Sequence, residues 1–259
     1  MSKHDGASGD GRRVKAVQTT NEILEALREL DGAGVTELAT HLDVAKATVH
    51  SHLATLVDDE FVVKRGETYH VSLRFVDFGE YAKTNVDIYE ITRKEVDRLA
   101  AETGEVAQFM VEEHGKGVYL HKASGENAIQ TASYTGNRKE LYCTALGKAI
   151  LSQLSRERVD EIIDETGLSP RTKNTVSTRE ELFEELADIR EQKVSYDDEE
   201  ILQGLRCVAA PIEHANGDIQ GAISVSGPTS RLKGERFREE LPEIVRGAAN
   251  VIEVNATHV

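Results

Sequence analysis

The sequence predicts an α+β protein with an N-terminal winged helix-turn-helix, a linker helix and a C-terminal domain built around an antiparallel sheet. Three helical patterns and a hairpin pattern lie close together near the N-terminus, an isolated helical pattern follows, and the remainder alternates paired strands with helices. A chain of 259 residues is long enough for two domains. We expect a disordered tail over residues 1–13, the winged helix-turn-helix over 14–76, the linker helix over 77–102 and the second domain over 103–259.

Three helical patterns occupy residues 20–59. The first has a candidate cap at Thr20-Asn21 and apolar residues at helical spacing, and the stretch DGAG at residues 31–34 ends it. A short second helix is predicted over residues 35–42. A tight turn at residues 43–45 leads into a third helix over residues 46–59. Two short helices, a three-residue turn and a third helix are the pattern of a helix-turn-helix.

The stretch FVVKRGETYHVSLRF, residues 61–75, predicts two strands around a turn at Gly66-Glu67. Apolar residues alternate with polar ones on both sides of the turn, as in a half-buried hairpin. A hairpin directly after the third helix is typical of the wing of a winged helix. Lys64 and Arg65 lie near its tip, where we expect them to contact DNA phosphates beside the groove.

The third helix has a surface suited to the DNA major groove. Val49, Leu53 and Leu56 form one apolar stripe that should face the domain core. The opposite side carries short groups that leave room for a groove and can reach base edges or phosphates. The candidate DNA-binding residues of this helix are Lys46, Ala47, Thr48, His50, Ser51 and Thr55. His52 is expected to be a surface group.

The charge of the chain is strongly negative and unevenly distributed. There are 46 acidic and 31 basic residues, which gives a formal net charge of −15. This balance favours a salt-rich cytoplasm, as in a halophilic microbe, because surface carboxylates keep a protein solvated there; an ordinary, mildly acidic cytoplasmic protein is the alternative. Residues 1–75 carry −3 and the rest −12. The N-terminal part can therefore still present a locally basic face.

Strands and helices alternate after residue 103. VAQFMVEEHGKGVYLHKA predicts a hairpin with its turn at residues 114–117, and CVAAPIEHANGDIQGAISVSG predicts another that turns at Asn216-Gly217. Helices are predicted over TALGKAILSQLS and over residues 156–166, 180–191 and 240–255. The preceding linker pattern ends at Thr103-Gly104, a suitable helix stop. This order of elements implies an α+β domain on an antiparallel sheet.

The sequence lacks the patterns of an enzyme, a metal site or an exported protein. Cys143 and Cys207 form no CxxC, and the histidines show no ligand spacing. The stretch ALGKA lacks the other residues of a P-loop, and no nucleophile elbow GxSxG occurs. No apolar signal core or membrane-spanning run is present. We expect a cytoplasmic protein that is not an enzyme and uses no cofactor, metal or membrane.

The chain resembles the IclR family of transcription regulators from about residue 14 to residue 255. The stretches that carry the resemblance are ELATHLDVAKATVHSHLATL with the hairpin after it, TALGKAIL, SYDDEEILQGLRCVAAPI and GDIQGAISVSGP. The resemblance implies a winged helix, a linker helix and a GAF-like α/β effector-binding domain. It also implies a dimer or tetramer on operator DNA whose activity is shifted by a small molecule.

The family's effector pocket can be carried over to this sequence one position at a time. Asp197 resembles the pocket aspartate and Cys207 the pocket cysteine, and Ser224 and Ser226 alternate on one strand. Ala145 and Leu146 lie at a helix start, where backbone N–H groups could bind a carboxylate. Ala128, Thr131 and Lys139 fall on less closely matching positions, and many family members have an apolar residue at the position of Lys139. Without the resemblance, Asp197 would be one solvated acid among four, Cys207 plain core, and the serines solvent-facing.

Two functions remain open on the sequence. The first is a transcription regulator of a catabolic pathway, whose homodimer or homotetramer binds a pseudo-palindromic operator and responds to an organic or sugar-derived acid. The second is a small-molecule-binding protein or enzyme whose N-terminal domain makes only protein contacts. A protein-binding helix would present large apolar or aromatic groups. The third helix presents Ala, Thr, His and Ser instead, which favours DNA.

Overall fold

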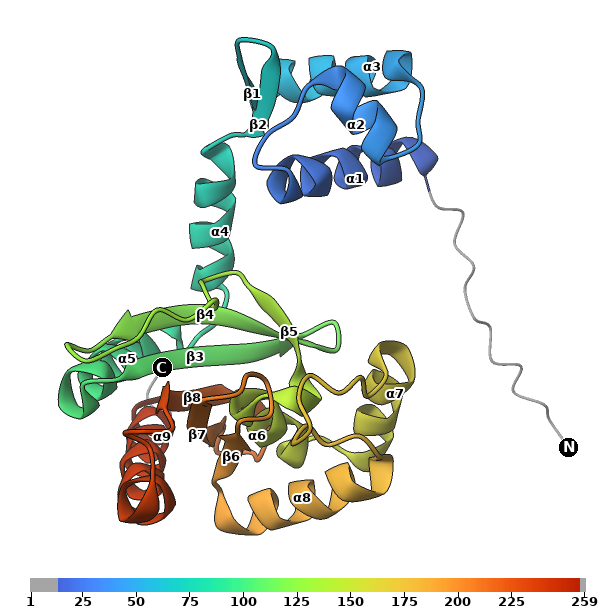
Figure 1. Cartoon of the computed structure of the whole chain (residues 1–259). Coiled ribbons are helices and arrows are strands. Elements are labelled where there is room, and N and C mark those ends of the chain that lie inside the picture. The colour runs from blue at the N-terminus through green and yellow to red at the C-terminus, as the bar shows by residue number, and fades with distance from the viewer. Residues whose placement is uncertain (1–13, 257–259) are drawn as a thin grey trace, which may run out of the picture. The chain divides into compact units, whose positions relative to one another are not determined.

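The computed structural model describes residues 14–256, and these divide into two compact units between Ala82 and Lys83 (Figure 1). The predicted tail over residues 1–13 lies outside the described residues. The helices and the antiparallel sheet confirm the predicted α+β class. No helix among the described residues is long and apolar enough to cross a membrane.

The N-terminal unit is a winged helix-turn-helix (Figure 1). Its elements are α1 (Lys15–Glu29), α2 (Val35–His41), α3 (Lys46–Asp58), β1 (Val62–Arg65), β2 (Thr68–Val71) and α4 (Arg74–Thr84). The three helices enclose a small core that contains Ile23, Leu38, Val49 and Leu53. β1 and β2 pair antiparallel from Val62 opposite Val71 to Arg65 opposite Thr68, so the turn lies at Gly66-Glu67 as predicted.

The start of α1 differs from the prediction. The helix begins at Lys15, five residues before the cap expected at Thr20. The Thr20 hydroxyl donates to the backbone carbonyl of Ala16, 2.9 Å away, and therefore bonds back into the helix rather than capping it. Val14 takes the N-cap position in an extended conformation without a side-chain cap.

The predicted single linker helix is two helices. α4 ends at Thr84, and α5 (Tyr89–Thr103) begins after a turn in which the N–H of Val86 donates to Lys83 O and that of Tyr89 to Val86 O. α4 has no buried residue, whereas α5 buries Val96 and Leu99 in the core of the second unit. The apolar pattern over residues 88–100 therefore belongs to a helix of the C-terminal core. The segment that links the two units is α4. α5 ends at Thr103 with a left-handed Gly104, as predicted.

The C-terminal unit is built on a six-stranded antiparallel sheet with strand order β5-β4-β3-β8-β7-β6. The strands are β3 (Val106–Glu113), β4 (Lys116–Ser124), β5 (Arg138–Glu140), β6 (Ser195–Asp198), β7 (Leu205–Glu213) and β8 (Ile219–Pro228). The two predicted hairpins are β3-β4 and β7-β8. The short strands β5 and β6 at the sheet edges were not predicted.

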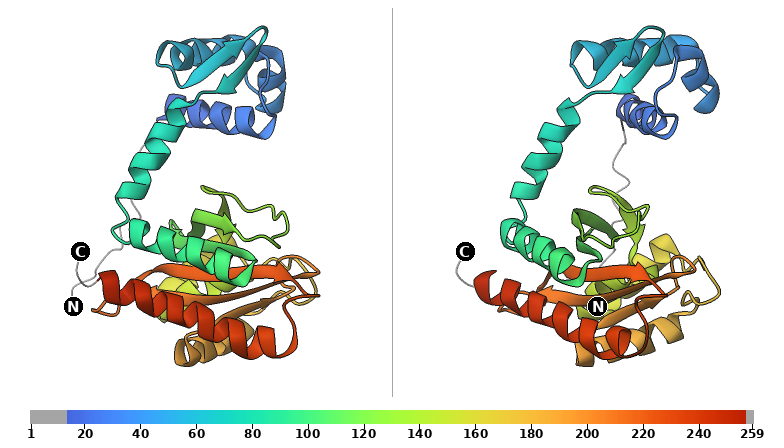
Figure 2. Two further views of the ribbon diagram at one scale, coloured as in Figure 1. Left: turned by 90° about the vertical axis from the view of Figure 1, so that its left-hand side faces the viewer. Right: turned by 60° about the vertical axis from the view of Figure 1, so that its left-hand side comes forward.

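Helices cover both faces of this sheet. One face packs against α5 and α9 (Leu241–Ala256), which lie side by side (Figure 2). α9 directly follows a π-helical turn at Arg236–Glu240. The other face packs against α6 (Ala145–Gln153), with α7 (Arg156–Thr166) and α8 (Arg179–Gln192) outside it. A 3-10 turn at Leu141–Cys143 leads from β5 into α6. The start of α6 is thereby placed against β7 and β8.

Candidate functional site

The outward face of α3 is exposed to solvent and carries mostly short side chains. Val49 and Leu53 are fully buried in the core, and the six candidate residues on the other side are exposed: Lys46, Ala47, Thr48, His50, Ser51 and Thr55. The hydroxyl of Ser51 donates to Ala47 O at 3.0 Å, and that of Thr55 to Ser51 O at 3.2 Å. Their oxygens keep free lone pairs toward solvent, so they can accept hydrogen bonds without leaving the helix.

His52 fixes α3 against α1, a role that the sequence did not reveal. Its Nδ1 shares a hydrogen bond of 2.8 Å with the Thr20 hydroxyl, and its ring is half-buried. The expectation of a surface group was wrong because His52 directly precedes the buried Leu53 and lies at the edge of the buried stripe, within reach of Thr20 of α1. A pairing across 32 residues leaves no local pattern in the sequence.

The hairpin β1-β2 presents two exposed cations, Lys64 and Arg65. The Lys64 ammonium group lies 5.4 Å from the ring centroid of Tyr69, which supports the hairpin against Ala33. Gly66 at the tip has φ +60, and nothing lies within 4 Å of the position a Cβ would take. Within residues 14–256, neither cation is paired with a carboxylate, so both are available to an anionic partner.

A cavity of about 510 Å³ lies in the C-terminal unit at the start of α6. Seven of the nine residues predicted to bind an effector line it: Thr131, Lys139, Ala145, Leu146, Asp197, Cys207 and Ser226. Ala128 and Ser224 do not. Ser224 is completely buried in β8, and its hydroxyl has no hydrogen-bond partner. Two residues from Ser226, it lies on the same face of β8, but it is outside the cavity lining.

The cavity has further walls that the sequence did not indicate. Gln108 and Tyr119 line it from β3 and β4, and the loops at residues 129–133 and 201–205 border its mouth. The first loop is held by Lys122, whose ammonium donates to Thr131 Oγ1 at 2.8 Å and Ser133 O at 2.7 Å. Burial lowers the pKa of Lys122. Loops that come together only in the folded chain carry no motif, so they could not be predicted.

The N-terminus of α6 lines the cavity, where its backbone N–H groups can bind a ligand. Thr144 caps the helix, accepting from the N–H of Gly147 at 2.9 Å. The N–H groups of the first turn have no acceptor within the helix, and the helix dipole favours negative charge there. Ala145 and Leu146 line the cavity at this point, and Lys139 adds a cation. The arrangement suits a carboxylate.

Another part of the wall carries two ionisable groups whose pKa values are raised by burial, the carboxyl of Asp197 and the thiol of Cys207. Asp197 is 2 % exposed, and burial raises its pKa to about 6 despite hydrogen bonds from the N–H groups of Glu200 and Ile201. Burial raises the pKa of Cys207 to about 12, so its thiol remains protonated at neutral pH. With Ser226 and Thr131, the wall offers hydroxyl, thiol and carboxyl groups to the polar end of a ligand.

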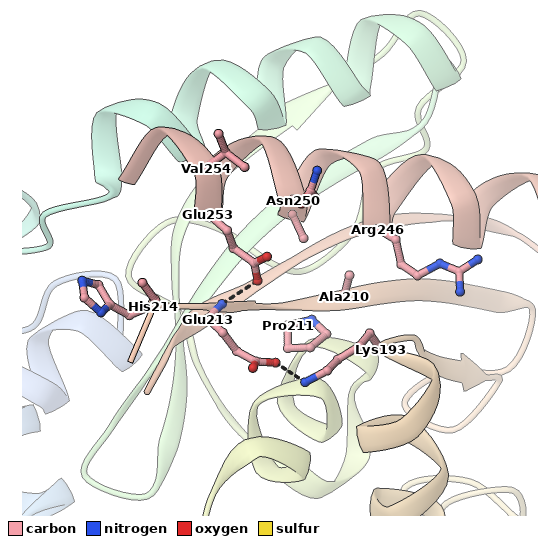
Figure 3. A pocket seen from close by; sticks show the side chains of 11 residues that line it. Lys193, Ala210, Pro211, Glu213, His214, Arg246, Asn250, Glu253 and Val254 are labelled. Atoms are coloured by element: carbon pink, nitrogen blue, oxygen red, sulfur yellow. Dashed lines mark hydrogen bonds and ion pairs between the residues drawn. The ribbon is translucent and has the colours of Figure 1, made fainter. Parts of the chain in front are cut away.

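A second hollow, between β7 and α9, is a weaker candidate (Figure 3). The charged groups Lys193, Glu213 and Glu253 in it already have partners. The Lys193 ammonium pairs with Glu213 and donates to Gln153 at 3.0 Å, and Glu253 accepts from the backbone N–H of Glu213 at 2.8 Å. None of the predicted binding residues lies there. A ligand would have to replace these bonds rather than complete them.

Substitution of Asp197 by asparagine should stabilise the fold at neutral pH. Its folded-state pKa of about 6 exceeds the unfolded value of roughly 3.9. The folded state therefore loses stability as pH rises from 4 to 7 and this carboxyl ionises, whereas asparagine keeps the hydrogen bonds without the charge. The gain of Asp197→Asn over the wild-type free energy of unfolding should grow by about 3 kcal/mol at most across that range. Denaturant titrations in concentrated potassium chloride measure it, with the exposed Asp188→Asn as control; a gain independent of pH would contradict the assignment.

Among the described residues, no group of three or more His, Cys, Asp and Glu side chains could hold a metal ion.

Comparison with known proteins agrees with this arrangement in both units. Residues 81–254 match the family described as bacterial transcriptional regulator IclR C-terminal, and residues 16–66 match the IclR helix-turn-helix domain. The chain is 35% identical over 258 residues, 98% of each chain, to a probable HTH-type transcriptional regulator ArcR from Halobacterium salinarum. The halophilic source of this relative is consistent with the acidic composition.

Solved structures show the same fold. The IclR of Thermotoga maritima is 26% identical with a TM-score of 0.75, and the match covers 93% of this chain and 97% of that one. An IclR homolog from Microbacterium hydrocarbonoxydans, solved in complex with 4-hydroxybenzoate, is 18% identical with a TM-score of 0.82, covering 95% and 100%. These relatives are named as regulators or IclR homologs and not as enzymes. The chain belongs to the IclR family of transcription regulators.

Proposed function

We propose that the protein binds operator DNA through α3 and the wing, and that a small organic or sugar-derived acid in the cavity of the C-terminal unit controls this binding. The observation that carries the proposal is the start of α6, which presents unpaired N–H groups and Lys139 to a cavity that is also lined by hydroxyl groups, the protonated thiol of Cys207 and the carboxyl of Asp197. This combination recognises a carboxylate at one end and hydroxyl or carbonyl groups at the other.

The DNA-binding part of the proposal rests on the faces of the N-terminal unit. α3 presents short polar groups that fit the major groove, and Lys64 and Arg65 can neutralise phosphates beside it. A homodimer or homotetramer would place two copies of α3 on a pseudo-palindromic site. In a salt-rich cytoplasm, counterion release contributes little to binding, so base and shape contacts should carry more of the affinity.

Control by an effector requires different affinity for two arrangements of the assembly, because equal affinity shifts no population. The 4-hydroxybenzoate bound by the Microbacterium homolog is a carboxylic acid with a hydroxyl at its far end. Its carboxylate and hydroxyl match the polarity of the cavity here. We infer that the regulated genes belong to a catabolic pathway for an acid of this kind.

The test is fluorescence anisotropy of labelled DNA from the region upstream of the protein's own gene, in concentrated potassium chloride. Carboxylic acids, among them 4-hydroxybenzoate and sugar acids, are added one at a time. We expect specific binding that one acid strengthens or releases. Specific DNA binding that only apolar compounds alter would overturn the effector class. Absence of specific sites in a genome-wide binding map would overturn the DNA-binding role.

Two substitutions should separate phosphate contacts from base contacts. Arg65→Ala should weaken binding to all DNA sequences by a similar factor, because a phosphate contact carries no sequence information. Ser51→Ala should change the preference among operator variants, at about 1–3 kcal/mol for a lost base contact. Lys173→Ala removes an exposed cation from the C-terminal unit and serves as control. An unchanged affinity in Arg65→Ala would show that the wing does not contact DNA.

A further inference from the structure

A completely buried lysine lies behind the cavity wall. Lys148 of α6 is 0 % exposed, and its ammonium donates to Glu185 Oε1 of α8 at 2.5 Å and to Glu200 Oε1 at 2.6 Å. A buried cation is tolerated only when its charge is compensated and its donors are satisfied. No motif in the sequence singles this lysine out, since ALGKA is not a P-loop. Its two carboxylate partners connect α6 to α8 and to the turn that contains Glu200.

Glu200 belongs to the turn that orients Asp197. The N–H of Glu200 donates to Asp197 Oδ1 at 2.7 Å, and the Thr175 hydroxyl donates to Glu200 O at 2.6 Å. Glu199, in the left-handed region at φ +63, accepts from the N–H of Gly204 at 2.8 Å. The same turn leads into residues 201–205, which border the cavity. The Glu200 side chain is therefore the link between this wall and the helix behind it.

Lys148 also follows the pocket-lining start of α6 by one turn. Ala145 and Leu146 present the N–H groups proposed to hold a carboxylate, and the side chain of Lys148 reaches from the next turn to Glu200. We propose that Lys148 is a positioning residue of the effector pocket: through Glu200 it fixes the turn that orients Asp197 and ties that turn to the start of α6. The proposal rests on the proposed function of this cavity as the effector site.

Lys148 also affects the ionisation of the two buried carboxyls near it, those of Glu200 and Asp197. Burial raises the pKa of Glu200 to about 7 and that of Asp197 to about 6, and the Lys148 cation opposes both increases. The Oε2 atom of Glu200 is buried and has no hydrogen-bond partner. The other ionisable groups that face these two carboxyls are Glu185 of α8, Asp198 of β6, Cys207 of β7, Tyr119 of β4 and Cys143. Lys148 is a cation that lowers the pKa of both carboxyls, so it makes Asp197 easier to ionise than burial alone would allow.

The test is a carboxyl titration of the full-length protein labelled with ¹³C at the aspartate side-chain carboxyl, followed by NMR. The Asp197 signal is assigned by its loss in Asp197→Asn. In Lys148→Met, the Asp197 titration should move to higher pH, with proton binding at least tenfold tighter, because the cation that lowers the pKa of Asp197 is gone. Ile150→Val, a buried apolar change on the same helix, should leave it in place. An Asp197 titration that is unchanged in folded Lys148→Met would overturn the proposal.

Glu200→Gln keeps the side-chain shape and Lys148, and it serves if Lys148→Met does not fold. Removing the carboxylate of Glu200 leaves the Lys148 charge less compensated near Asp197, so the Asp197 titration should move to lower pH. A titration that stays in place or moves to higher pH would overturn the proposal.

Calorimetry with 4-hydroxybenzoate and sugar acids then measures the affinity of the pocket for these acids. We expect acid binding at least tenfold weaker in Lys148→Met than in Ile150→Val. If no acid binds the wild type, the effector class fails, whereas the titration still decides the role of Lys148.

Discussion

Replacement of Gly147 by alanine should unfold the C-terminal unit or prevent it from folding. A Cβ at this position of α6 would lie 2.1 Å from the carbonyl oxygen of Leu141 and 2.5 Å from its Cα. Both are backbone atoms of the 3-10 turn that leads into the helix, and Leu141 is itself buried in the core. The clash can be relieved only by moving the turn or the helix, at a cost of roughly 3 kcal/mol or more. Denaturant unfolding followed by circular dichroism measures it.

Gly247 provides the matched control. It also lies inside a helix, α9, but it is exposed and nothing lies within 4 Å of the position a Cβ would take. Gly247→Ala should therefore stabilise the protein by about 1 kcal/mol, the usual advantage of alanine over glycine inside a helix. Equal effects of the two substitutions would show that α6 and the turn before it are not packed as closely as the structure has them.

These two glycines also show where prediction from sequence ends. Both read as isolated glycines within helical patterns, and nothing local distinguishes the one under a backbone turn from the one in solvent. Helices with regular apolar spacing were predicted almost to the residue: α7 at Arg156–Thr166 and α8 within one residue at each end. Periodicity reports which face is buried. It does not report which distant segment covers that face.

The candidate site divides in the same way. Asp197, Cys207 and Ser226 could be placed because family motifs surround them, and they lie around one cavity. Gln108 and the loop at residues 129–133 also line it, but they come from segments without a motif. The β5 and β6 strands at the sheet edges have three and four residues, too few for the alternation of a strand to stand out. Such parts are determined by tertiary contacts.

An acidic residue in the middle of the α3 face should abolish operator binding while leaving the fold intact. Ser51 is exposed, and its hydroxyl bonds only to the carbonyl of Ala47 one turn earlier, so Ser51→Asp disturbs no packing. In the groove, however, a carboxylate would face phosphates and base acceptors at short range, where like-charge juxtaposition costs several kcal/mol. We expect operator affinity to fall by roughly 100-fold or more, as measured by fluorescence anisotropy in concentrated potassium chloride.

Ala187→Asp is the control for the added charge itself. Ala187 is exposed on α8 of the C-terminal unit, so this variant changes the net charge by the same amount away from the DNA-binding face. Because long-range fields are screened within a few ångströms in concentrated salt, its operator affinity should stay close to that of the wild type. A comparable loss in both variants would mean that overall charge, rather than α3, governs binding. A loss confined to Ser51→Asp would place this face of α3 against the DNA.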